Sequence, residues 1–84
     1  MLAQLTDLDL AGTRVTDAGV AIVARIPTLA RLWLNDLAGV TDHGAAALRR
    51  ARALVRVNLS GTAVSLTGAD ALRAERPTLD VIRW

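Results

Sequence analysis

The chain of 84 residues lacks cysteine, phenylalanine and tyrosine, and its only aromatic residues are two tryptophans. Without cysteine it can form no disulfide, no thiolate metal site and no cysteine nucleophile. Its hydrophobic fraction of 52% consists mostly of Leu, Val and Ala, which predicts a thin aliphatic core. Such a core suits small units that stack on one another, and the length leaves room for one core only.

Lysine is also absent, so all ten basic residues are arginines, and the formal net charge is only +2. A balance this small bears on solubility and does not indicate a nucleic-acid partner. Arg or Asp interrupts every long apolar stretch, which excludes a membrane-spanning helix. The first ten residues contain Asp7 and Asp9 and no basic residue, unlike a signal peptide. We therefore expect a cytoplasmic protein that does not bind membranes, with secretion as an effector left open.

What the chain does contain is a ladder of apolar residues with the spacing L-x-x-L-x-L, which occurs four times. The ladders start 24, 25 and 25 residues apart, at Leu5, Leu29, Leu54 and Leu79. Because side chains alternate along a strand, the ladder residues should point inward and the residues between them outward. We expect short parallel strands near residues 7–11, 31–35, 56–60 and 81–84.

A polar hinge and a helical stretch of small residues follow each of the first three ladders. The expected N-cap residues are Thr16, Thr41 and Ser65. Glycine recurs at one position of the first turn, at residues 19, 44 and 68, although glycine costs about 1 kcal/mol inside a helix. This recurrence implies that the neighbouring unit approaches closely there. Pro27 and Pro77 should end their helices.

A ladder of this kind with this period is the signature of a leucine-rich repeat. The predicted fold is α/β, a right-handed solenoid of about three repeats with parallel strands on the concave face and short helices on the convex face. We expect one domain, residues 1–84. Its parts are the tail of a preceding repeat (1–4), three repeats (5–28, 29–53 and 54–78) and the start of a fourth (79–84).

The ladder followed by T-x-V-T-D-x-G, as in residues 5–19, resembles a known repeat family. It is similar to the bacterial and F-box-associated leucine-rich repeats of the ribonuclease-inhibitor-like superfamily, close to the GALA-type subclass. The resemblance covers nearly all of the chain and implies a non-catalytic scaffold for protein recognition. Some family members are secreted effectors that carry an F-box. No F-box-like segment is present here, so the resemblance does not imply ubiquitin-ligase adaptor activity.

The residues that could support catalysis are few and far apart. His43 is the only histidine, and the only serines, Ser60 and Ser65, belong to the strand and hinge of the next repeat. A Ser-His-Asp triad would have to bridge two edges of the solenoid, and one histidine provides no metal cluster. Asp17 and Asp42 occupy equivalent capping positions, which explains them structurally. We therefore expect no enzyme activity, no cofactor, no metal and no small-molecule substrate.

The outward positions of the concave sheet form rows that are the predicted site for a protein partner. The first row is Asp7, Arg31, Arg56 and Val81; the second is Asp9, Trp33, Asn58 and Arg83; the third is Ala11, Asn35 and Ser60. The predicted partner-binding residues are Asp7, Asp9, Arg31, Trp33, Asn35, Arg56, Asn58 and Arg83. An exposed Trp beside Arg is typical of binding hot spots. The structural alternative is that Trp33 only covers its strand neighbours.

In this register Arg56 lies beside Val81 and Arg83 with no carboxylate in reach, which predicts an acidic patch on the partner. Two other roles remain open, and the first is structural. The chain could be a segment of a longer array without binding of its own. The uncapped apolar ends of such a segment, including Leu79, predict self-association.

The other role is anion or nucleic-acid binding through an arginine stripe on the convex face. The stripe comprises Arg25, Arg49, Arg50, Arg52, Arg73 and Arg76. Cations near helix C-termini also complement the helix dipole, and no aromatic residue is interleaved with these arginines for base stacking. Nucleic acid is therefore not the partner we expect.

Overall fold

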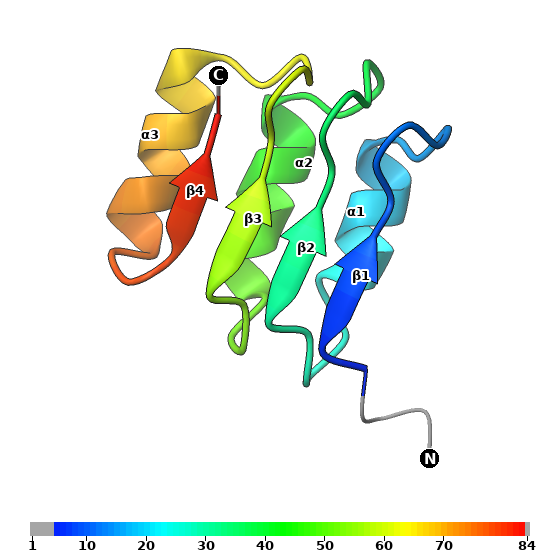
Figure 1. Cartoon of the computed structure of the whole chain (residues 1–84). Helices are drawn as coiled ribbons and strands as arrows, with labels where there is room; N and C mark the ends of the chain where they lie inside the picture. The colour runs from blue at the N-terminus through cyan, green and yellow to red at the C-terminus, as the bar shows by residue number, and fades with distance from the viewer. Residues whose placement is uncertain (1–4, 84) are drawn as a thin grey trace.

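In the computed structural model, which describes residues 5–83, the chain forms a four-stranded parallel sheet and three α-helices (Figure 1). The elements are β1 (Asp7–Asp9), α1 (Asp17–Val23), β2 (Arg31–Trp33), α2 (Asp42–Ala47), the 3₁₀ turn η2 (Leu48–Arg50), β3 (Arg56–Asn58), α3 (Leu66–Glu75) and β4 (Asp80–Ile82). The expected α/β class is confirmed. The predicted tail 1–4 and the last ladder position, Trp84, lie outside the described residues.

Strands and helices alternate along the chain, and the strands lie side by side in sequence order. Each strand has three residues, so the strands are shorter than the sequence predicts. Figure 1 shows all three helices on one side of the sheet. The opposite side of the sheet, hereafter the sheet face, is covered by no described element.

The core lies between the sheet and the helices and is entirely aliphatic. The ladder residues of the second and third units are all buried, as predicted: Leu29, Leu32, Leu34, Leu54, Val57 and Leu59. The helices contribute Val20, Ala45, Leu48, Ala69 and Leu72. The first ladder lies at the edge of this core, so Leu8 and Leu10 are only partly buried and Leu5 is exposed.

The predicted register of the fourth strand is wrong by one residue. Arg56 pairs with Asp80 and Val57 with Val81, so β4 begins one position earlier than the ladder indicates. Val81 is only 7% exposed and takes the inward position, while Ile82 pairs with Asn58 and lies in the outward row. A slip of one residue exchanges the two faces of a strand. Leu79 is buried before the strand begins, and not exposed at an open end.

Threonine hydroxyls close the turns after β1 and β3. Thr13 Oγ1 donates to the Leu10 carbonyl oxygen at 2.7 Å, and Thr62 Oγ1 donates to that of Leu59 at 2.6 Å. The second unit has no threonine at this point, and the buried Leu37 packs into the core instead. Its turn contains Asp36 with a φ of +64°. This irregular loop follows from the extra residue between 35 and 39.

Asp17 and Asp42 connect each helix start to the next one. Asp17 accepts hydrogen bonds from Thr41 N at 2.7 Å, Thr41 Oγ1 at 2.5 Å and Gly44 N at 3.1 Å. Asp42 accepts bonds from the backbone N–H and the hydroxyl of Ser65, both at 2.7 Å. A Cβ atom on Gly44 would lie 2.5 Å from Asp17 Oδ1. Close approach of the neighbouring unit is thus confirmed at Gly44, and each aspartate braces the following unit.

Candidate functional site

The sheet face carries two rows of outward side chains whose order follows from the strand pairing. The first residue of each strand pairs with the first residue of the next, and these residues form the outer row: Asp7, Arg31, Arg56 and Asp80. Asp9, Trp33, Asn58 and Ile82 form the central row. The structure therefore brings six of the predicted site residues together and adds Asp80 and Ile82.

The charges of the outer row are paired with one another. Arg31 Nη1 lies 3.1 Å from Asp7 Oδ1, and Arg56 Nε lies 3.2 Å from Asp80 Oδ2. About half of each of these side chains is exposed, so each pair contributes only about 0–1 kcal/mol to stability. The prediction that Arg56 has no carboxylate in reach is wrong. It depended on the incorrect register, which placed Val81 where Asp80 lies.

The central row is uncharged from Trp33 to Ile82. Trp33 and Ile82 are half-buried apolar side chains on either side of the Asn58 amide. Asn58 Oδ1 accepts a hydrogen bond from Ser60 N at 2.9 Å, which fixes the amide at the end of β3. Asp9 Oδ1 accepts the equivalent bond from Ala11 N at 2.9 Å. Within residues 5–83 the Asn58 amide N–H groups donate to no protein group.

Two predicted site residues lie outside the outer and central rows. Arg83 Nε donates to the Val64 carbonyl oxygen at 2.7 Å, so this side chain ties the end of β4 to the loop before α3. The same alternation that turns Val81 inward turns Arg83 inward, and its assignment to the central row is wrong. Asn35 follows β2 and is half-buried, with Nδ2 3.5 Å from Asp36 Oδ2. It borders the face without belonging to either row.

The carboxylates with a lowered pKa lie between the helix starts and not on the sheet face. Partial burial alone would raise the pKa of Asp17, but the hydrogen bonds from Thr41 and Gly44 outweigh it and hold the pKa below its ordinary value. The hydroxyl and the backbone N–H of Ser65 lower the pKa of Asp42. These shifts follow from the bracing bonds, because hydrogen bonds to a carboxylate favour its charged form.

The candidate catalytic residues do not form a triad in the part of the chain that the structure describes. The Ser65 hydroxyl donates to Asp42 and accepts from Gly68 N, while His43 is exposed. Over the same residues, no group of three or more His, Asp or Glu side chains is placed to hold a metal ion. No helix within them has the length and the apolar character needed to cross a membrane.

Comparison with known proteins does not assign this chain to a family. No protein-family model matches the chain, and no curated protein matches it.

Proposed function

We propose that this chain is a leucine-rich-repeat recognition module that binds a protein partner through its sheet face, without catalysis or a cofactor. The observation that carries the proposal is the central row, in which Trp33 and Ile82 lie on either side of the Asn58 amide. Parallel sheets are usually covered on both faces, and here only one face is covered by described elements. Solenoid proteins bind partners on such extended open sheets.

The pairing of charges changes the expected chemistry of the partner. Since Asp7 and Asp80 compensate Arg31 and Arg56, the sheet face does not call for an acidic patch. The central row instead suits a partner with an apolar side chain over Trp33 and a carbonyl or carboxylate oxygen that accepts from the Asn58 amide. Burying an indole at the centre of an interface is typical of the few residues that dominate binding energy.

The test begins with affinity capture on immobilised wild-type chain, followed by titration calorimetry on the captured protein. Trp33→Ala should weaken the affinity by about 30-fold or more, which corresponds to about 2 kcal/mol. Asn58→Ala should weaken it as well, while Ala18→Ser, on an exposed position of α1, should change it less than about twofold.

Circular dichroism establishes that each variant remains folded. A partner whose affinity is unaffected by both Trp33→Ala and Asn58→Ala would show that the sheet face is not the binding surface.

A further inference from the structure

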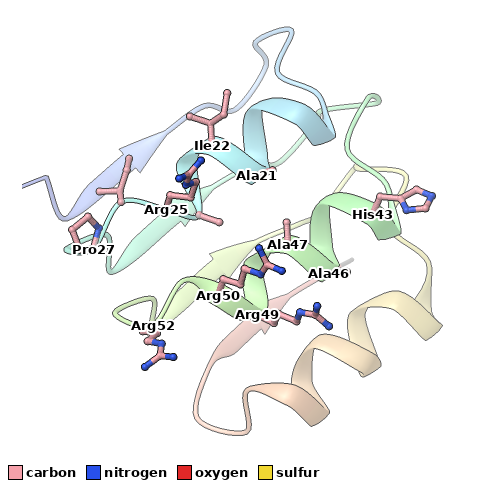
Figure 2. Close-up of a pocket in the computed structure, with 12 residues that line it drawn as sticks. Ala21, Ile22, Arg25, Pro27, His43, Ala46, Ala47, Arg49, Arg50 and Arg52 are labelled. Atoms are coloured by element: carbon pink, nitrogen blue, oxygen red, sulfur yellow. The ribbon is translucent and has the colours of Figure 1, made fainter.

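A groove with a volume of about 980 Å³ lies between α1 and α2 on the helix side of the molecule (Figure 2). Four arginines line it: Arg25 in the turn after α1, Arg49 and Arg50 in η2, and Arg52 just after η2. Figure 2 shows Arg25 on one wall and Arg49 and Arg50 on the other. Among residues 5–83, no carboxylate lines this α1–α2 groove.

Among the described residues, these four arginines differ from most of the others in having no hydrogen-bond or ion-pair partner. Within residues 5–83, none of the four donates a hydrogen bond or forms an ion pair. By contrast, Arg73 pairs with Asp70, and Arg76 donates to the carbonyl oxygens of residues 51, 52 and 54. Two members of the predicted arginine stripe are therefore engaged in holding the fold. Apart from Arg14, the arginines without such a partner in this part of the chain all line the groove, and Arg49 also borders a smaller hollow lined by Asp42 and Glu75.

The groove also has an apolar component. Ile22 is 69% exposed, and it lines the groove together with Ala21, Ala46 and Pro27. The small side chains of Ala21 and Ala46 leave room between the two helices. A surface that combines exposed apolar side chains with unpaired arginines is complementary to a ligand that is apolar on one side and acidic along its flanks.

We propose that the α1–α2 groove binds an acidic amphipathic helix of a protein partner. The apolar side of that helix would contact Ile22 and the alanines, and its Glu or Asp side chains would meet Arg25 and Arg50 on the two walls. Guanidinium groups match carboxylates with paired hydrogen bonds, and helices commonly bind in grooves with apolar anchors three and four residues apart. The seven residues of α1 span about 10 Å, enough to contact about two turns of a bound helix.

The same observations argue against a nucleic acid in this groove. Binding of single strands relies on aromatic side chains that stack on bases, and no aromatic residue of the described part of the chain lines the groove. The described aromatic residue, Trp33, lies on the sheet face. A nucleic acid would also gain nothing from the exposed Ile22. This proposal is independent of the function proposed for the sheet face.

The probe is a fluorescein-labelled peptide of about fourteen residues, about four helical turns, with Leu along one side and Glu along the flanks. Binding is followed by fluorescence anisotropy, with a scrambled peptide of the same composition as reference. We expect the scrambled peptide to bind at least about tenfold more weakly, because it cannot present both surfaces at once.

Charge reversal in the groove supplies the second readout. Arg25→Glu and Arg50→Glu should each weaken binding about tenfold or more, since each replaces an attraction by a repulsion. The matched control is Arg14→Glu, which reverses another exposed arginine outside the groove, one with no ion-pair partner among the described residues, and should change binding less than about twofold. Ile22→Ser should weaken binding about threefold, while Leu66→Ser, at a similarly exposed position on α3, should not.

Three results would overturn the proposal. Equal effects of Arg14→Glu and Arg50→Glu would mean that the peptide responds to net charge alone. Equal binding of the scrambled peptide would mean that no amphipathic helix is recognised. Tighter binding of oligothymidine, or of vesicles that contain phosphatidylserine, than of the helical peptide would assign the groove to a different class of partner.

Discussion

The brace formed by Asp17 makes a quantitative prediction about stability. In Asp17→Ala, Thr41 and Gly44 lose three hydrogen bonds to a carboxylate. Each bond to a charged group contributes about 1.5–3 kcal/mol, but water reaches this half-buried site and replaces part of the loss. We therefore expect destabilisation by about 2–3 kcal/mol, above the range of about 0.5–2 kcal/mol for loss of an ordinary helix cap.

Urea unfolding followed by circular dichroism measures this loss. For a chain of this size the free energy of unfolding falls by about 1 kcal/mol per molar urea, so the midpoint should drop by about 2–3 M. Asp70→Ala is the matched control, because it removes an exposed carboxylate whose partner is Arg73, three residues along α3. The control should cost about 0.5 kcal/mol or less. Equal midpoints for Asp17→Ala and Asp70→Ala would refute the brace.

The pH dependence of stability checks the same prediction in a second way, because protonation of Asp17 weakens the bonds that Asp17→Ala removes. Folding lowers the pKa of Asp17 and of Asp42 below the ordinary value of 3.8. The stabilisation is therefore complete above that ordinary value, and it is lost as the pH falls through the lowered pKa of the folded state. Asp17→Ala lacks one of the two groups, so its urea midpoint should fall less steeply than that of the wild type below about pH 4. Parallel curves would exclude this role.

Two further substitutions test the core and the arginine that holds three carbonyl groups. Leu32→Ala, at a position only 1% exposed, should destabilise the protein by about 2–5 kcal/mol. Leu66→Ala, at a position 64% exposed, should change stability by less than about 0.5 kcal/mol. Thermal unfolding compares the two variants, and similar melting temperatures would contradict the assigned core. Arg76→Ala should cost about 1–3 kcal/mol by removing the donors to residues 51, 52 and 54. In urea unfolding it should exceed Arg73→Ala, and the reverse order would show that those contacts contribute little.

The spacing of the ladders was sufficient to predict the strands of the first three units and their inward side. In the first and third units a single apolar residue lies between polar ones, as at Arg56, Val57 and Asn58, so that one register buries the ladder. The turn threonines were predictable for a similar reason, since a hydroxyl at that point can satisfy the turn backbone. These features are local, and local patterns are visible in one sequence.

The fourth strand was not predictable because its sequence permits two registers. Leu79, Val81 and Ile82 are all apolar, so a shift of one residue leaves an apolar side chain facing the core in either case. Two contacts with the third unit distinguish the registers: Asp80 meets Arg56, and Val81 packs beside Val57. Both involve residues more than twenty positions away. The same error affected the predicted binding site, because the one-residue shift removes Arg83 from the sheet face.

The role of Asp17 was misassigned for a related reason. A Thr-Asp pair at a helix start is typical of capping within that helix, but the N-cap Thr16 makes no side-chain capping bond, and Asp17 bonds to the next unit. The groups that donate hydrogen bonds to the carboxylate are a hydroxyl and backbone N–H groups. Backbone groups are present at almost every residue, so the sequence does not identify them as partners. The glycine at position 44 was the available signal, because it indicated a close neighbour without identifying it.

Charge pairing separates the two candidate surfaces more clearly than charge content does. Both contain arginines, and a net charge of +2 distinguishes neither. On the sheet face, Arg31 and Arg56 already have carboxylates beside them, so a partner gains little by bringing another. In the α1–α2 groove no carboxylate from residues 5–83 is present, and a partner that supplied one would reduce repulsion among the arginines as well as adding an attraction. We therefore expect binding at the sheet face to depend mainly on Trp33 and shape, and binding in the groove to depend mainly on charge.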